Sequence, residues 1–97
     1  MQRWVNEMFT QTKDFIISTD ILSRDIQHFV YFVQGLSSAV YIVADRMVNA
    51  RSILGILSLG LRKNSKITIH LHNEEEQSAI EDMKRISDYL SGEFCGG

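Results

Sequence analysis

Residues 66–72 of this chain alternate strictly between polar and apolar side chains, and they read KITIHLH. Successive side chains of a β-strand point to opposite faces of a sheet, so Ile67, Ile69 and Leu71 share one face and the polar residues share the other. Such a strand has one buried and one solvated face. We therefore expect an antiparallel sheet whose buried face is covered by helices.

A helical pattern follows this strand. Asn73 is a candidate cap, and the acidic residues 74–76 favour the positive end of a helix dipole. Apolar residues then recur at intervals of three and four, which indicates one buried helical face. The members of this stripe are Ala79, Ile80, Met83, Ile86 and Leu90.

Shorter elements precede the alternating strand. The pattern predicts strands at 15–18, 39–43 and 47–48, a helix at 25–34 and a second helix that starts at Ser52. The resulting order is β-α-β-β-α-β-α. This order predicts one two-layer domain.

The chain has 97 residues and a formal net charge of −2, and its Lys and Arg residues are spread along the sequence. A chain of this length suits one domain whose function lies on its surface rather than in a deep cavity. It lacks the concentrated positive patch that is typical of nucleic-acid-binding proteins. We therefore expect protein partners and no nucleic acid.

No stretch reaches the roughly 18 uninterrupted apolar residues of a membrane span, and the first residues lack the apolar segment of a signal peptide. The single cysteine, Cys95, has no partner for an internal disulfide. We expect a cytoplasmic protein with no membrane segment. The predicted divisions are a leader of uncertain order over 1–14, a domain over 15–91 and a flexible Gly-rich tail over 92–97.

Residues 48–69 carry the most specific pattern in the sequence. They contain a serine at a helix start, apolar residues around Gly55, a Ser-Leu-Gly triplet at 58–60 and then the alternating strand. This pattern resembles the HPr phosphocarriers of the bacterial sugar phosphotransferase system, and the order of elements agrees over residues 15–90. The resemblance implies an α+β, HPr-like open-faced β-sandwich, in which three helices cover one face of a four-stranded antiparallel sheet.

The chain departs from this family at one motif. In the family, the first strand leads into Gly-Ile/Leu-His-Ala-Arg-Pro, whose histidine accepts a phosphoryl group from enzyme I. Residues 20–25 read DILSRD, so Leu22 stands at the histidine position, Asp25 replaces the proline and Arg24 is kept. Leucine has no nucleophilic or titratable atom, and a carboxylate at the helix start repels an incoming phosphoryl group. We therefore expect no phosphoryl transfer here and no enzymatic activity.

The histidines that are present are weaker candidates. His28 lies beyond the exposed amides of the first helical turn, where nothing would hold a phosphate. His70 and His72 share one strand face, a spacing that can bind a divalent metal when a third ligand converges. No third ligand is evident in the sequence. We expect exposed histidines, no metal and no cofactor.

Ser52 is the second site that the resemblance implies. It matches the regulatory serine that HPr kinase/phosphorylase modifies in many low-GC Gram-positive bacteria, and Ile53, Leu54 and Leu57 match the docking patch beside that serine. A phosphate at this helix start would add about −1.5 to −2 charges next to an apolar surface. The alternative is that Ser52 is only a helix cap and that the apolar run is only core packing.

The first functional hypothesis is a noncatalytic regulatory or adaptor protein, in the pattern of the Crh-like members that keep the serine and lack the histidine. An exposed Leu22 would enlarge its partner-binding face, and Arg24 and Arg51 are candidates to pair with a phosphate on Ser52. The partners that the resemblance implies are an HPr kinase/phosphorylase-like kinase and a LacI-type catabolite regulator or another component of the phosphotransferase system.

Two alternatives stay open at this point. One is an active phosphocarrier that uses a non-standard residue such as His28. The other is a degenerate paralogue that acts as an oligomerisation or scaffold module, with a homodimer formed through the face of Leu22 and Leu54.

Overall fold

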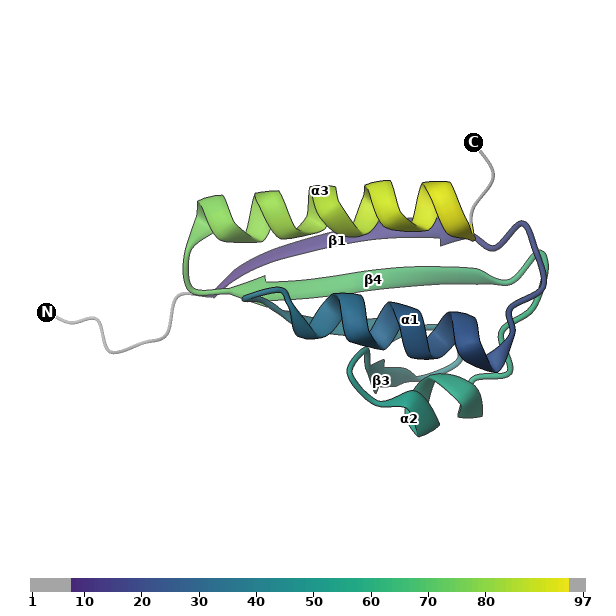
Figure 1. Ribbon diagram of the computed structural model, residues 1–97. Helices are drawn as coiled ribbons and strands as arrows, with labels where there is room; N and C mark the ends of the chain where they lie inside the picture. Colours follow the sequence, from purple (N-terminus) through teal and green to yellow (C-terminus); the bar gives the residue numbers. More distant parts are fainter. Residues whose placement is uncertain (1–7, 95–97) are drawn as a thin grey trace, which may run out of the picture.

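The computed structural model describes residues 8–94, and within them four strands and three helices follow the predicted order. The strands are β1 (Phe9–Ile16), β2 (Ala39–Val43), β3 (Met47–Asn49) and β4 (Lys66–Asn73); the helices are α1 (Ser23–Gln34), α2 (Ile53–Ser58) and α3 (Glu76–Glu93). All paired strands are antiparallel, in the spatial order β1-β4-β2-β3. Helices α1 and α3 run along the sheet, and α2 lies beside α1 (Figure 1). The predicted α+β open-faced sandwich is confirmed.

The alternation in β4 separates the two faces of the sheet, as predicted. Ile69 and Leu71 are fully buried beneath the helices, whereas His70 is half-buried on the opposite face. Ile69 pairs directly with Ile42 of β2, and Leu71 pairs with Val40. Burying each of these side chains stabilises the folded state by roughly 1.5–3 kcal/mol relative to leaving it exposed. These apolar cross-strand pairs form the centre of the core.

The two long helices bury one stripe each. In α1 the buried residues are Ile26, Phe29, Val30 and Val33, at helical spacing. The α3 stripe consists of Ala79, Met83, Ile86 and Leu90. Ile80, predicted in that stripe, is 44% exposed. One residue is about 100° of rotation in a helix, so Ile80 lies off the face that Ala79 presents to the core, and this part of the prediction is wrong.

Strand β1 begins at Phe9, six residues before the predicted start, and ends at Ile16 rather than Ser18. Residues 9–14 were expected in a leader of uncertain order, but each of them pairs with β4, starting with Phe9 opposite Asn73. Most of their side chains are exposed on both faces. This segment therefore has no hydrophobic alternation, and its strand structure comes from backbone pairing with β4.

The helix ends also differ from the prediction. Helix α1 starts two residues early, at Ser23, and α3 extends to Glu93, beyond the predicted domain end at residue 91. Asn73 does not cap α3; its Oδ1 accepts the N–H of Glu75 at 2.9 Å in the preceding turn. Residues 1–7 and 95–97, which include Cys95, lie outside the described part. No helix within residues 8–94 is long and apolar enough to cross a membrane.

Candidate functional site

The N-cap residue of helix α1 is Leu22, whose side chain cannot accept a hydrogen bond. The Leu22 carbonyl accepts the N–H of Asp25 at 2.9 Å and that of Ile26 at 3.2 Å. In the opposite direction, Oδ2 of Asp25 accepts the N–H of Leu22 at 2.9 Å. This second bond is one half of a capping box. Asp25 therefore makes the reciprocal bond of the box, while the bond that a polar side chain at residue 22 would accept from the first turn is missing.

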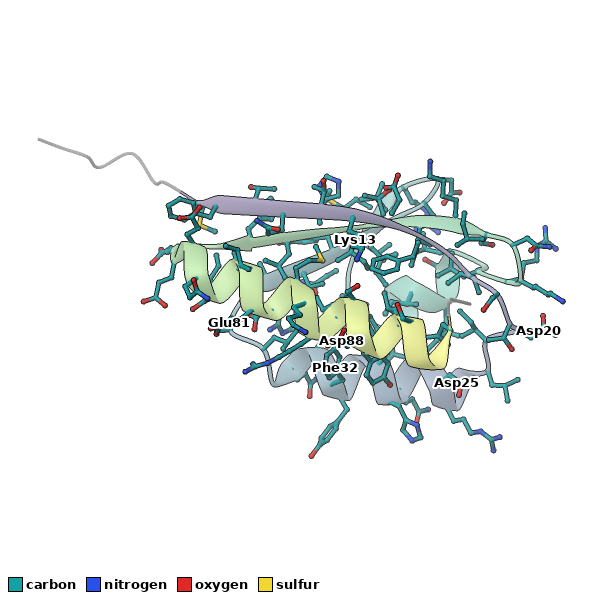
Figure 2. All side chains as sticks on the ribbon, turned by 90° about the horizontal axis from the view of Figure 1, so that it is seen from above. Lys13, Asp20, Asp25, Phe32, Glu81 and Asp88 are labelled. Atoms are coloured by element: carbon teal, nitrogen blue, oxygen red, sulfur yellow. The ribbon has the colours of Figure 1, made fainter. Side chains whose placement is uncertain are left out.

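The Asp25 carboxylate gives the start of α1 a fixed negative charge. Figure 2 shows Asp25 at the beginning of α1 and Asp20 in the loop that enters it. The N–H groups of Ser23 and Arg24 have no acceptor within residues 8–94. An anion that approached these two amides would meet the carboxylate that already occupies the positive end of the helix dipole.

Leu22 presents an apolar side chain to solvent at this helix start. Leu22 is 51% exposed, and leucine has no atom that can accept a phosphoryl group. His28, the nearest histidine along α1, is exposed to solvent in the second turn.

Ser52 caps α2, as predicted. Its Oγ accepts the N–H of Gly55 at 2.9 Å, and the serine is exposed. A Cβ at position 55 would lie 3.0 Å from Ser52 Oγ and 3.3 Å from Val48 Cβ, so a larger residue there would require these neighbours to shift. Ser52 therefore caps the start of α2 and is exposed to solvent at the same time.

Three apolar side chains of α2 point away from the core. Leu54 is 79% exposed, Leu57 41% and Ile53 37%, whereas Ile56 is buried. We call Ile53, Leu54 and Leu57 the α2 patch. The alternative interpretation, in which the whole apolar run is core packing, holds only for Ile56. Contiguous exposed apolar side chains on a small protein are typical of an interaction site.

Met47 of β3 also belongs to the exposed apolar residues around α2. It is 53% exposed, and β3 leads directly into the turn before α2 (Figure 1). The sequence predicts Met47 only as part of a short strand at 47–48. No local pattern distinguishes Met47 from Val48, because both are apolar; their different exposure comes from the structure.

The two arginines considered as phosphate ligands lie at different ends of α1. Arg24 is exposed in the first turn. Nη2 of Arg51 donates to the carbonyl of Val33 at 3.2 Å and to that of Leu36 at 3.1 Å, at the helix C-terminus. Residues 24 and 33 are separated by about 14 Å along the helix axis. The two arginines therefore start from opposite ends of the helix, and Arg51 donates to carbonyls at the end of α1.

Arg46 has the same role at the end of α2, which the sequence analysis missed. From the turn between β2 and β3, its Nη2 donates to the carbonyl of Ser58 at 2.8 Å and to the Ser58 hydroxyl at 2.9 Å. Neither α1 nor α2 has a basic residue in its own last turn. Both helices thus receive a positive charge at their negative end from an arginine elsewhere in the chain.

His70 and His72 lie on the open face of the sheet. Their rings are 6.5 Å apart, and Nδ1 of His72 is 3.0 Å from Oγ1 of Thr10. Within residues 8–94 no cluster of three or more His, Cys, Asp or Glu side chains is arranged to hold a metal ion. The geometry gives these histidines no third ligand.

The described part of the chain contains a small apolar cavity between the sheet and the ends of the helices. Its volume is about 30 Å³, and its ten lining residues, among them Ile17, Phe29 and Phe94, are all apolar. This space is comparable to that of one water molecule. It offers neither the volume nor the polar groups of a substrate site.

Comparison with known proteins is consistent with this arrangement. A family model described as "PTS HPr component phosphorylation site" matches residues 12–88. HPr-like protein Crh of Bacillus subtilis (strain 168) is 30% identical over 77 residues, which are 78% of this chain and 91% of that protein. HPr-like protein Crh of Halalkalibacterium halodurans is 33% identical over 66 residues, which are 67% of this chain and 79% of that protein.

Solved structures show the same fold. The crystal structure of phosphocarrier protein HPr from Bacillus anthracis str. Ames has a TM-score of 0.71 and 29% identity, covering 82% of this chain and 95% of that one. HPr-C-His from Thermoanaerobacter tengcongensis has a TM-score of 0.63 and 27% identity, covering 88% and 97%. The family match extends from β1 into α3 and includes the starts of α1 and α2. The chain therefore belongs to the HPr family of the bacterial phosphotransferase system.

Proposed function

We propose that this chain is a noncatalytic HPr-like regulatory or adaptor protein of the sugar phosphotransferase system, which acts in the cytoplasm by binding other proteins. Its contact face consists of the α2 patch together with Leu22. Its switch is phosphorylation of Ser52. Two similar proteins, both named HPr-like protein Crh, support the regulatory assignment.

The observation that carries the proposal is the exposed α2 patch directly behind an exposed serine. Leu54 presents nearly all of its side chain to solvent, and Ser52 lies two residues before it. Burying a leucine of this kind in an interface contributes about 1.5–3 kcal/mol. The exposed apolar area of the α2 patch is therefore suited to binding a partner protein. Ser52 lies next to this patch, so a phosphate on Ser52 would change the charge beside it.

Phosphorylation changes this face without requiring the domain to refold. Ser52 Oγ already accepts the Gly55 N–H, and phosphate oxygens are stronger acceptors for the same donor. The added charge, about −1.5 to −2, would sit beside Ile53 and Leu54. A partner that requires an apolar surface would lose affinity, and one with a basic pocket next to an apolar groove would gain it.

The noncatalytic part of the proposal rests on the start of α1. In this proposal Leu22 stands where phosphocarriers of this family have histidine, and leucine has no nucleophile. The proposed partners are a kinase of the HPr kinase/phosphorylase type and a LacI-type catabolite regulator or another phosphotransferase component.

Intact-mass measurement after two parallel incubations tests the proposal. The chain is incubated with ATP and an HPr kinase/phosphorylase, and separately with phosphoenolpyruvate and enzyme I. One phosphate from the kinase, absent in Ser52→Ala, is the expected result. Phosphate transferred from enzyme I contradicts the noncatalytic assignment and favours the phosphocarrier alternative. No phosphate from the kinase on a folded chain contradicts the switch.

A matched pair of surface variants tests the contact face. Leu54→Ser removes the most exposed side chain of the α2 patch, and Ile80→Ser removes an exposed apolar side chain of α3. The test measures binding of the serine-phosphorylated chain to a LacI-type catabolite regulator. Leu54→Ser should weaken binding at least tenfold, and Ile80→Ser should leave it unchanged. Equal effects of both variants, or self-association through this face, would favour the scaffold alternative.

A further inference from the structure

The open face of the sheet carries two imidazoles side by side. His70 and His72 lie on β4, an inner strand of the sheet, and their ring centroids are 6.5 Å apart. The long helices cover the other face of the sheet (Figure 2). Thr12 and Thr10 of β1 lie directly opposite the two histidines. Both imidazoles are half-buried among uncharged neighbours, and both keep access to solvent.

The ring of His72 is held by two contacts. Its Nδ1 lies 3.0 Å from Oγ1 of Thr10, and the ring of Tyr41 meets it edge-on at 5.9 Å. When Thr10 accepts the Nδ1 proton, Nε2 carries the lone pair that a ligand can use. Metal-binding histidines are commonly oriented by a hydrogen bond at their other nitrogen in this way. Thr10 thus turns His72 into a ready ligand.

The two histidines provide only half of the ligands that a zinc ion takes. Zn²⁺ binds four ligands tetrahedrally, with imidazole nitrogens at about 2.0–2.1 Å, so two nitrogens that share the ion are at most about 4 Å apart. The ring nitrogens lie at the ring edges, and rotation of both rings toward each other brings these nitrogens closer than the centroids. Within residues 8–94, no further His, Cys, Asp or Glu joins the pair.

We propose that His70 and His72 form one half of a zinc site, and that a second copy of this chain supplies the other half. The two copies are related by a twofold axis through the ion, so each contributes the same two imidazoles. The four nitrogens complete the tetrahedron. Zinc therefore joins two chains through their open sheet faces.

The charges of the open face favour a second copy as the occupant. The charged side chains on this face in β1 and β4 are those of Asp14 and Lys66, which lie 3.6 Å apart and form an ion pair. The face as a whole therefore has no net charge, and an identical face meets no like-charge repulsion. The helical layer, which carries the α2 patch, stays accessible in such a dimer. The proposal does not rest on the proposed function.

Sedimentation velocity of the untagged full chain, in EDTA and with added Zn²⁺, tests the proposal, and titration calorimetry gives the stoichiometry. We expect a monomer in EDTA and a dimer with one zinc ion for two chains. His70→Gln and His72→Gln should each abolish this dimer. His28→Gln removes the remaining histidine of the chain and should dimerise like the unmodified protein. Thermal unfolding in EDTA confirms that each variant is folded.

Three further variants separate this site from other ways to join two chains. Thr10→Val should weaken the zinc affinity by about tenfold, because Nδ1 of His72 loses its hydrogen-bonding partner. Leu54→Ser tests contact through the α2 patch, and Cys95→Ser tests zinc binding by the thiol. Both should leave the zinc-dependent dimer unchanged.

A monomeric complex of one zinc ion with one chain overturns the inference, and so does a dimer that forms equally in EDTA. Persistence of the zinc-dependent dimer in both His70→Gln and His72→Gln overturns it as well. Loss of the dimer in Leu54→Ser or Cys95→Ser would place the contact elsewhere and is equally contrary. None of these outcomes bears on phosphorylation of Ser52, whose test is separate.

Discussion

At the start of α1, the N-cap residue Leu22 has an exposed apolar side chain, and the side-chain hydrogen bond comes from the Asp25 carboxylate. Ser, Thr, Asp or Asn at an N-cap accepts a backbone N–H, and leucine cannot. Asp25 provides only the reciprocal bond, to the N–H of Leu22. The chain thus has an exposed apolar residue at a position where a polar residue would stabilise the helix.

Leu22→Ser should raise the free energy of unfolding by about 1 kcal/mol, because the hydroxyl can accept an N–H of the first turn. The same change should weaken partner binding, because it removes a 51% exposed apolar side chain. Urea unfolding measures the first effect. Leu54→Ser, which removes apolar surface without adding a cap, should change stability by less than about 0.5 kcal/mol. A lower stability of Leu22→Ser would contradict the capping argument.

Asp82 of α3 is the buried acid of the core, with 3% of its surface exposed. Its Oδ2 accepts the Ser38 hydroxyl at 2.6 Å, the Ser38 N–H at 3.1 Å and the Ser37 hydroxyl at 3.2 Å. Arg85, one turn further along α3, lies 3.6 Å from Oδ1. The carboxylate therefore fixes the loop between α1 and β2 against α3.

Asp82→Ala should lower the free energy of unfolding by about 3 kcal/mol, because the Ser38 donors are left buried without their acceptor. The matched control is Asp88→Ala, which removes an exposed acid of the same helix that forms an i,i+4 ion pair with Lys84. That change should cost less than about 0.5 kcal/mol. Similar losses for both variants in urea unfolding would show that burial of Asp82 is energetically unimportant.

At the scale of elements, α1 and α2 both depend on arginines from outside their own sequence. Arg51 binds carbonyls at the end of α1, and Arg46 binds the end of α2. A six-residue helix such as α2 is too short to be stable alone. Its cap at Ser52 and its contact with Arg46 therefore matter to the whole α2 patch.

Arg51→Ala should lower the free energy of unfolding by about 1–2 kcal/mol, because two carbonyls at the end of α1 lose a charged donor. Arg24→Ala removes an exposed arginine at the other end of the helix and should change stability by less than about 0.5 kcal/mol. Chemical unfolding followed by circular dichroism measures both. Equal losses of unfolding free energy in Arg51→Ala and Arg24→Ala would mean that Arg51 contributes only its charge and does not cap the helix.

The pairing of β1 with β4 includes a contact of Asp14 whose contribution to stability depends on pH in the acid range. The hydroxyl of Thr68, which donates to Asp14 Oδ1 at 2.6 Å, is the main cause that lowers the pKa of this carboxyl below its ordinary value of 3.8, and Lys66 adds to it. A lowered pKa in the folded state means that the contact stabilises the protein above the ordinary pKa. That contribution is lost as the pH falls through the lower, folded-state pKa.

Thr68→Val should raise the pKa of Asp14 toward its ordinary value, because the donor is removed at nearly constant volume. The stability difference between Thr68→Val and the unmodified chain should be present near about pH 6 and should shrink as the pH falls below the ordinary pKa of Asp14. Carboxyl NMR titration and urea unfolding at several pH values measure both effects. Thr12→Val, on the same open face of the sheet, should leave the pKa of Asp14 unchanged.

At the scale of the molecule, the end of α3 closes the core against the loop that follows β1. Phe94 is 7% exposed and lines the apolar cavity. Its carbonyl accepts the N–H of Ser18 at 2.7 Å and the Ser18 hydroxyl at 3.0 Å. Residues 76 positions apart in the sequence are thereby joined.

Phe94→Ala should lower the free energy of unfolding by about 3 kcal/mol, because it enlarges an existing cavity in the core. Ser91→Ala, an exposed change one turn earlier, should leave the stability within about 0.5 kcal/mol of the unmodified chain. Equilibrium unfolding in urea compares the two. A loss below about 1 kcal/mol for Phe94→Ala would show that the core closes without this side chain.

Sequence patterns that extend over a few residues were sufficient to predict much of the fold. The alternation of β4 and the helical stripes of α1 and α3 each show which side chains are buried, because strand and helix periods are local properties. The cap at Ser52 was predicted for the same reason: its hydroxyl and the Gly55 N–H are only three residues apart. The HPr family itself was recognised from the segment around Ser52.

Only the tertiary structure decided which contacts join distant segments. Residues 9–14 form a strand because β4 pairs with them, and Asp82 is buried because Ser38, 44 residues away, supplies its donors. The outward direction of the α2 patch also depends on how α2 packs beside α1. The sequence by itself determined the element order, most of each buried face and the Ser52 cap of α2, because periodicity and capping act over a few residues. Pairing, distant caps and surface patches depend on packing between elements that no local pattern records.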